Sequence, residues 1–225
     1  LHSFGQEASS AVENSREKIA DFLNCKSEEV IFTSGATEAN NIAIQGLVKE
    51  GDHIITTSIE HPAVLETCQY LEKKGVEVSY VKPQSDGVIK PEDVQKEIKD
   101  NTVLISIMYA NNEIGTIQPI KEIGEIIKDK NIVFHTDAVQ ATGYLDMDVE
   151  KLNVNLLSLS GHKIYGPKGI GVLFVKKGTK VQKIQHGGHH EFKIRPGTLN
   201  VPGIVGLNKA IELIQTRNNK TIKAL

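Results

Sequence analysis

Apolar residues along the chain follow two alternating patterns. Short apolar runs with strand character are separated by segments in which apolar residues recur at helical spacing. Strands are predicted at Val30–Phe32, His53–Thr57, Val76–Val81, Val103–Ile107, Ile132–His135, Asn155–Leu159 and Gly171–Val175. Helices are predicted at Glu7–Leu23, Ala39–Val48, Pro62–Lys74, Pro91–Lys99, Ile120–Lys128 and Gly206–Gln215. This alternation is typical of βαβ units, so we predict an α/β fold: a sheet of about seven mostly parallel strands with helices on both faces.

One lysine lies in a glycine- and proline-rich loop between the last two predicted strands. Lys163 follows Ser160 and His162 in the stretch SLSGHKIYGPKGIGVLFV. Most lysines are solvated surface groups. However, ligands of open α/β sheets gather where strands end, and a lysine in a partly desolvated pocket becomes a nucleophile toward carbonyls. We therefore hypothesise that Lys163 forms a Schiff base.

The turn TSGATE at residues 33–38 leads into the second predicted helix. Free N–H groups at a helix N-terminus and the helix dipole attract anions, so a phosphate would suit this turn. The alternative is an ordinary N-cap, which Ser and Thr form commonly. Taken alone, the turn favours that simpler interpretation.

Polar side chains follow several predicted strands at the point where each strand ends. His61 follows the second strand, Asn112 the fourth, and Asp137 and Gln140 the fifth. Because the carboxyl ends of parallel strands share one edge, these groups and Lys163 are expected in one cleft. Single residues have plainer explanations, since His61 would suit a turn before proline and Asp137 would suit a helix cap. The convergence of residue types favours a site.

Pyridoxal phosphate is a cofactor whose needs match this set of side chains. It requires a lysine, a carboxylate that keeps its ring nitrogen protonated, donors for its phosphate and a group against its ring. Asp137 suits the ring nitrogen, Gln140 the phenolic oxygen and His61 the ring face. The side chains that suit the phosphate are Thr37, Ser160 and His162.

Composition narrows the class of protein. With 225 residues, of which 39% are hydrophobic and 24% charged, the chain fits one large domain or one with a small appendage. The 26 basic and 28 acidic residues are interspersed, so neither nucleic acid nor a membrane surface is an expected partner. No apolar run approaches the ~18 residues of a membrane span, and no signal-peptide pattern is visible, so we expect a cytoplasmic protein.

The cysteines and the clustered histidines give little support for a metal. Cys25 and Cys68 have neither disulfide-framework nor zinc-ligand spacing, and we expect both to be buried, inert and remote from the site. Three histidines, His186, His189 and His190, lie in a glycine-rich loop without a carboxylate pattern. No metal is therefore predicted.

Six blocks of the sequence resemble one protein family. The blocks FTSGATEANNIAI, EHPAVLETC, NNEIGTIQPI, HTDAVQATG, SLSGHKIYGPKGIG and RPGTLNVPGIVG occur in the order found in cysteine desulfurases. These enzymes belong to the class V aminotransferase group of fold-type I pyridoxal phosphate enzymes. NNEIG, DAVQ and GPKGIG are most similar to the branch that supplies sulfur for iron–sulfur cluster assembly and nitrogenase maturation.

The resemblance implies a role for each matching residue. Lys163 would carry the cofactor, Asp137 would pair with its ring nitrogen, and His61 would stack on the ring and shuttle protons. Gln140 and Asn112 would reach the hydroxyl side of the ring and the incoming amino acid. The phosphate would be held by Ala36, Thr37, Ser160 and His162, and by Thr198 of a neighbouring subunit.

The resemblance also implies domain organisation and partners. Residues 1–205 would form the large domain without its N-terminal edge, and residues 206–225 would begin the helix that leads to a small C-terminal domain. The expected partners are L-cysteine, a second copy of the chain in a homodimer, and an iron–sulfur scaffold or another sulfur acceptor. Pro196 stands where relatives commonly have Ser or Ala, which leaves the loop before Thr198 less well matched.

The family's sulfur-attacking cysteine and substrate-binding arginine belong to its C-terminal part and match no residue here. The expected function is therefore that of a desulfurase large domain, inactive alone. Two alternatives stay open: another class V enzyme, such as a selenocysteine lyase or an aminotransferase, or a truncated, non-catalytic dimerisation or scaffold module.

Overall fold

The computed structural model describes residues 2–224 and the side chains of residues 2–217. Seven strands form one sheet in the order β1-β7-β6-β5-β4-β2-β3, and β7 alone runs antiparallel to its neighbours β1 and β6. The predicted α/β fold with a mostly parallel sheet is therefore confirmed. The strands are β1 (Val30–Thr33), β2 (His53–Thr57), β3 (Glu77–Val81), β4 (Thr102–Ser106), β5 (Val133–Asp137), β6 (Leu156–Ser160) and β7 (Gly171–Val175).

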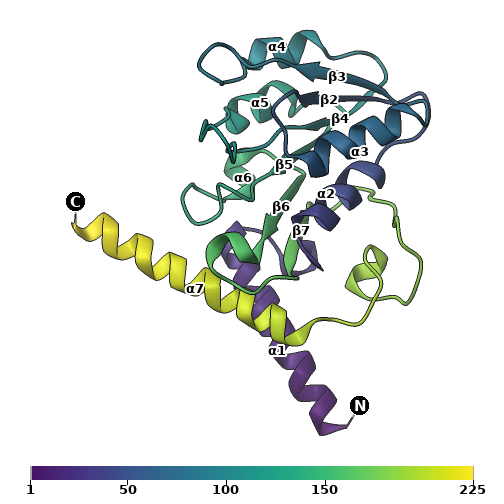
Figure 1. Cartoon of the computed structure of the whole chain (residues 1–225). Helices are drawn as coiled ribbons and strands as arrows, with labels where there is room; N and C mark the ends of the chain where they lie inside the picture. The colour runs from purple at the N-terminus through teal and green to yellow at the C-terminus, as the bar shows by residue number, and fades with distance from the viewer. Residues whose placement is uncertain (1, 225) are drawn as a thin grey trace.

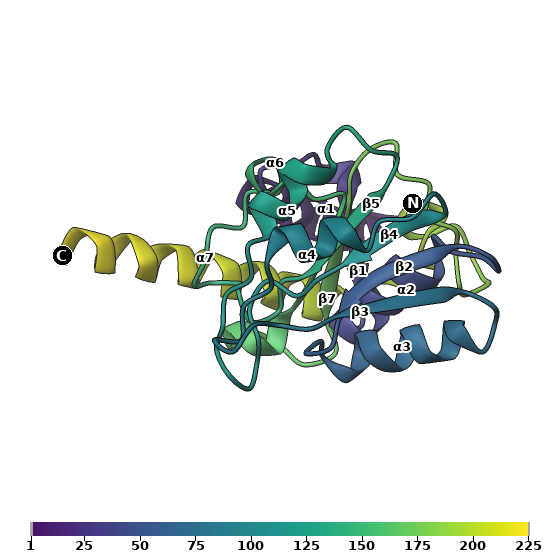
Figure 2. The same cartoon turned by 90° about the horizontal axis from the view of Figure 1, so that it is seen from above.

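Helices cover both faces of the sheet (Figures 1 and 2). Side chains alternate between the faces along each strand, so that Ile54 faces one layer and Ile55 the other. The layer of α2 (Ala36–Gln45) and α3 (Pro62–Glu72) covers one face. The opposite layer consists of α1 (Ser3–Leu23), α4 (Pro91–Lys96), α5 (Ile120–Ile127), α6 (Val149–Leu152) and α7 (Val201–Ala224).

Local sequence explains where the helices begin and end. Asn24 adopts a left-handed conformation with φ of 54° and stops α1, while Pro62 occupies the first turn of α3 behind its N-cap His61. Helix α7 begins at Val201 rather than at the predicted Gly206. Asn200 explains the difference, because its Oδ1 accepts the backbone N–H of Gly203 at 3.1 Å and so caps the helix earlier.

Helices α1 and α7 pack against each other beside the sheet, and α7 extends well beyond it (Figure 1). None of the described helices is long and apolar enough to cross a membrane.

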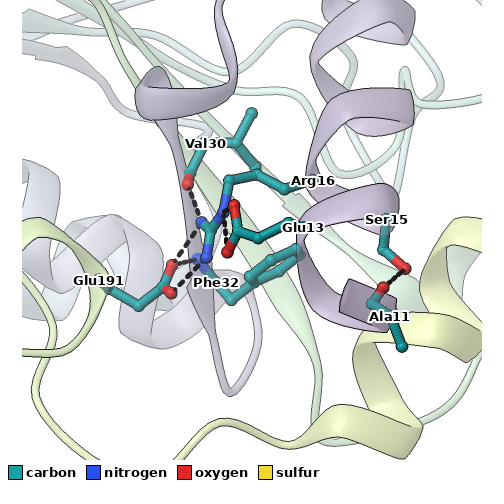
Figure 3. A network of polar contacts seen from close by, with 7 residues as sticks. All are labelled: Ala11, Glu13, Ser15, Arg16, Val30, Phe32 and Glu191. Atoms are coloured by element: carbon teal, nitrogen blue, oxygen red, sulfur yellow. Dashed lines mark hydrogen bonds and ion pairs between the residues drawn. The ribbon is translucent and has the colours of Figure 1, made fainter. Parts of the chain in front are cut away.

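A buried ion pair ties the segment after β7 to α1 and β1 (Figure 3). The Arg16 guanidinium donates to both carboxylate oxygens of Glu191, at 2.9 and 2.7 Å, and to the carbonyl of Val30 at 2.6 Å. The Glu191 carboxylate also accepts the backbone N–H of Phe32 at 2.6 Å. The two charged side chains are only 3% and 1% exposed, so their partners in the protein replace water almost completely.

Removing one partner of this pair should destabilise the fold. Glu191→Gln removes the buried carboxylate that binds Arg16 and leaves it only Glu13, whose side chain is 55% exposed, so we expect a loss of about 3 kcal/mol in the free energy of unfolding, measured in urea. Glu77→Gln serves as the control, since Glu77 and its partner Lys99 are both well exposed. Equal effects of the two substitutions would contradict a structural role for the Arg16–Glu191 pair.

Candidate functional site

The predicted site residues meet around one cavity at the carboxyl ends of the parallel strands. Its volume is about 550 Å³, which lies within the range of small-molecule sites. Thr198 is exposed and does not contribute to the lining. The predicted residues that line the cavity are Ala36, Thr37, His61, Asn112, Asp137, Gln140, Ser160, His162 and Lys163.

One end of the cavity is formed by the N-terminus of α2. The N-cap is Gly35, which makes no side-chain capping bond, so the Ser/Thr turn is not the ordinary cap that it suggested. The first backbone N–H groups of the helix therefore remain available to an anion. Ser160 lies close by at the end of β6, with its hydroxyl 2.8 Å from Nδ1 of His162.

A close approach between two backbones fixes this end of the cavity. A Cβ added to Gly171, the first residue of β7, would meet the Cα of Gly35 at 2.7 Å. Only glycine permits the start of β7 to lie so near the turn that opens α2. The result is that the helix N-terminus lies beside Ser160 and the loop that carries Lys163.

Asp137 forms the buried floor of the cavity. Its side chain accepts a hydrogen bond from Nδ2 of Asn40 at 2.7 Å and another from the backbone N–H of Val139 at 3.0 Å. The residue is 6% exposed, and no ion pair to it is found among the described side chains. Burial raises the pKa of Asp137, while its hydrogen bonds and the nearby His61 act in the opposite direction.

His61 is held in one tautomer by the helix that it caps. Its Nδ1 accepts the backbone N–H of Ala63 at 3.1 Å, so the neutral ring carries its proton on Nε2. The ring lines the cavity at the N-terminus of α3. Proton transfer by His61 would therefore take place at Nε2.

Glu60 is buried next to the cavity and is hydrogen-bonded to Met108, which lines it. One carboxyl oxygen accepts the Thr57 hydroxyl at 2.7 Å and the backbone N–H of Met108 at 3.0 Å. The other oxygen is buried and has no partner among the described residues. Burial raises the pKa of Glu60 to about 8, despite these hydrogen bonds. The group is accordingly neutral at pH 7.

Lys163 lies at the mouth of the cavity, in the 3₁₀ turn Gly161–Ile164. The sequence suggested a partly desolvated lysine, but the side chain is exposed. Within the turn Gly161 and Ile164 are buried, so the turn packs through these two residues and leaves His162 and Lys163 between them exposed. A second lysine, Lys168, lines the same opening and was not predicted.

The residues present fit pyridoxal phosphate. Asp137 is a buried carboxylate with no ion-pair partner in the described part of the chain, α2 offers an uncapped N-terminus, and Lys163 lines the same cavity. Oδ1 of Asn40 is a further buried polar atom without a partner among the described side chains. A cofactor with an anionic group at one end and a basic ring nitrogen at the other would complement this arrangement.

Sequence reasoning missed residues that support the site from within the fold. Asn40 follows the apolar residue Ala39 on the buried face of α2, and a polar residue at such a helical position is a signal that was available. Glu38 and Arg195 form an ion pair across 157 positions, which no local pattern reveals.

Neither cysteine belongs to the cavity. Cys68 is fully buried in α3 and Cys25 is partly buried after α1. Burial raises the pKa of each thiol to about 12, which disfavours the reactive thiolate. Cys68 is buried as expected, whereas Cys25 is only partly buried. Within the described part of the chain, no group of three metal-binding side chains occurs.

The fold and the cavity together define the class of protein: a fold-type I, pyridoxal phosphate-dependent enzyme domain. The family model described as "Aminotransferase class-V" matches residues 1–225, and the chain belongs to that family. The family and the desulfurases within it depend on pyridoxal phosphate.

Within this family, the chain is similar to cysteine desulfurases. The chain is 51% identical over 229 residues to "Cysteine desulfurase IscS" of Dictyoglomus turgidum, covering 100% of this chain and 58% of the relative. Among solved structures, "NIFS-LIKE PROTEIN" has a TM-score of 0.93 at 43% identity and covers 98% of this chain and 62% of its own. "SspA in complex with cysteine" has a TM-score of 0.91 at 43% identity, covering 100% and 68%. The chain thus spans little more than half the length of the curated relative.

Buried Glu60 makes stability depend on pH in a direction unusual for a carboxylate. Its pKa is about 8 in the folded chain, against 4.5 for the ordinary group, so stability falls as pH rises between these values. Burial lowers the pKa of His135 to about 3, which gives the opposite slope below pH 6.5. Between pH 6.5 and 8 the Glu60 effect should dominate, with a slope that starts at about 1.4 kcal/mol per pH unit and falls to roughly half of that at pH 8.

Urea unfolding of the wild type and of Glu60→Gln across this range measures the effect. The difference between the two free energies of unfolding should shift steadily in favour of the variant as pH rises. Parallel curves for the two proteins from pH 6.5 to 8 would show that Glu60 is ionised in the folded state.

Proposed function

We propose that the chain is the cofactor-binding large domain of a cysteine desulfurase that takes sulfur from L-cysteine. The observation that carries the proposal is the buried Asp137 carboxylate, which accepts two hydrogen bonds, has no ion-pair partner among the described side chains and lines the same cavity as Lys163. A protonated ring nitrogen supplies the missing charge. The names of the relatives, including a structure with cysteine bound, support this choice of substrate.

Pyridoxal phosphate, when bound, supplies an electron sink for bonds at the α-carbon of an amino acid. Asp137 keeps the ring nitrogen protonated, because the ion pair replaces water that the buried carboxylate has lost. Gln140 and Asn112 orient the hydroxyl side of the ring and the substrate. His61 would lie against the ring and would give or take a proton at Nε2, because its Nδ1 accepts the backbone N–H of Ala63.

The phosphate is held at the α2 end of the cavity. Ala36 and Thr37 offer backbone N–H groups at the uncapped helix terminus, and Ser160 and His162 offer side chains there. Lys163 holds the cofactor covalently. The lysine approaches from the mouth of the cavity, which leaves the floor to Asp137.

Sulfur removal needs a second group besides the cofactor site. A cysteine thiolate attacks the sulfur of the substrate, the carbon–sulfur bond breaks, and the carbon keeps the electron pair and takes a proton. The products are alanine and a persulfide on the protein. In the family this cysteine and the arginine for the substrate carboxylate come from the C-terminal part, so the activity belongs to the whole protein.

The organisation of that whole protein follows the family. Residues 1–205 form the large domain, and the part of α7 from Gly206 onward leads to the small domain. Thr198 of each subunit reaches the phosphate in the other, which makes a homodimer the working form. The persulfide sulfur passes to an iron–sulfur scaffold or another acceptor protein in the cytoplasm.

Covalent labelling tests the role of Lys163. Adding pyridoxal phosphate to the purified chain should give a yellow protein, and borohydride should fix the cofactor at Lys163, as found by peptide mapping. Lys163→Ala should remain unlabelled, while Lys168→Ala should be labelled as the wild type is. A label on Lys168 instead would reverse the assignment of the two cavity lysines.

A colourless wild-type chain that takes up no pyridoxal phosphate would favour a scaffold or dimerisation module. Binding without desulfuration in a full-length protein would favour another class V enzyme, such as a selenocysteine lyase or an aminotransferase.

The chain as it stands should release no sulfide from L-cysteine, even with pyridoxal phosphate bound. Thiolate attack needs an exposed thiol of low pKa, whereas Cys68 is buried, Cys25 is partly buried, and burial raises the pKa of each thiol to about 12. The measurement is sulfide and alanine formation, with persulfide mapping by mass spectrometry. A chimera that continues into the C-terminal part of the Dictyoglomus relative should restore release. Turnover that Cys25→Ala or Cys68→Ala abolishes would place the nucleophile within this chain.

A further inference from the structure

A negative charge lies at the end of the cavity that suits an anion. Glu38 is in the first turn of α2 and lines the cavity together with Ala36 and Thr37. Its carboxylate accepts the backbone N–H of Ser34, an N–H from the same turn. The helix N-terminus thus carries its own carboxylate, where a phosphate would meet a like charge.

Arg195 offsets that charge. Its Nε donates to one carboxylate oxygen of Glu38 at 3.0 Å, and its Nη2 lies 3.4 Å from the other. The two side chains are 20% and 11% exposed, so solvent screens the pair less than it screens a surface ion pair. Burial acts to raise the pKa of Glu38, but the hydrogen bonds from Arg195 and Ser34 outweigh it and lower the pKa. Glu38 therefore remains charged and depends on Arg195 for compensation.

The segment that carries Arg195 is firmly anchored. Glu191, four residues earlier, forms the buried ion pair with Arg16 (Figure 3). Glu191, Phe192 and Lys193 all have positive φ, of 42°, 53° and 69°, a conformation that costs energy for residues other than glycine. Such a backbone persists because its surroundings hold it. Arg195 is consequently held near Glu38 by a fixed backbone, so little conformational entropy is lost when the two side chains pair.

We propose that Arg195 is a positioning residue for phosphate recognition: by neutralising Glu38 it allows an anion to occupy the N-terminus of α2. The inference rests on the proposed pyridoxal phosphate site and adds a residue to it. If Arg195 only held its loop in place, its removal would weaken binding whatever residue stood at position 38. Under our proposal, removal of Arg195 weakens binding only while Glu38 carries its charge.

A double-mutant cycle separates these two roles. The dissociation constant of pyridoxal phosphate is measured by absorbance and fluorescence titration for the wild type, Arg195→Met, Glu38→Gln and the double variant. Arg195→Met should weaken binding about tenfold, because an uncompensated carboxylate then faces the phosphate. Glu38→Gln keeps an acceptor for Ser34 and should bind at least as tightly as the wild type. The double variant should return to within about threefold of the wild type.

Two ligands that each carry only part of the cofactor show whether the loss of affinity arises at the phosphate. Pyridoxal, which lacks the phosphate, should bind all four proteins with similar affinity. Inorganic phosphate should compete with the cofactor less effectively in Arg195→Met than in the wild type. As a matched control, Lys99→Met and Glu77→Gln remove an exposed ion pair at the opposite edge of the sheet and should change neither affinity.

Each outcome decides the proposal. If the wild type binds no pyridoxal phosphate, the proposed function fails. If it binds but the double variant is as weak as Arg195→Met, the arginine only holds its loop and this inference fails. Circular dichroism monitors folding, and Arg195→Lys, which keeps the charge, provides a second variant that should bind within a few-fold of the wild type. Unfolding of Arg195→Met and of the double variant alike would also overturn the proposal.

Discussion

The hydrogen bond from Asn40 to Asp137 joins two elements that are 97 positions apart in the sequence. It fixes α2 against the end of β5. The distance between the N-terminus of α2 and the Asp137 carboxylate is therefore set by the fold. The close approach of Gly35 and Gly171 holds the same helix against the start of β7, which β6 separates from β5. With these two contacts in place, the two ends of the cavity are positioned before any ligand binds, and little ordering remains to oppose binding.

The buried carboxyl groups of this region cost the fold some stability. Asp137 and Glu60 both have raised pKa values from burial, and one oxygen of Glu60 has no partner in the described part of the chain. By contrast, His135 in the same sheet is buried, neutral and bonded to the hydroxyls of Ser106 and Ser158 at 2.8 and 3.0 Å. Of the residues that line the cavity, Asn40 thus keeps an unsatisfied oxygen, while His135 in the sheet interior is satisfied, as expected where a ligand completes the structure.

Much of the fold was predictable because the pattern of strands and helices is strong and regular. The order of the sheet and the reversal of β7 were not, since pairing joins segments that no local pattern relates. At the site, residues at strand ends such as Asp137 and His61 could be found, because topology sends strand ends to one edge. Asn40 and Arg195 could not be assigned to the site from the sequence, because each acts through a partner that is distant along the chain. The exposure of Lys163 likewise depends on how its turn leaves β6, which composition does not reveal.

The central claim is that Asp137 is built to face a protonated ring nitrogen. Nitrogen-15 NMR of the chain loaded with ring-labelled pyridoxal phosphate measures that protonation directly. We expect the chemical shift of a protonated pyridinium at neutral pH in the wild type, and that of a neutral pyridine in Asp137→Asn, which keeps the shape but loses the charge. A neutral ring nitrogen in the wild type, or a protonated one in both proteins, would contradict the account.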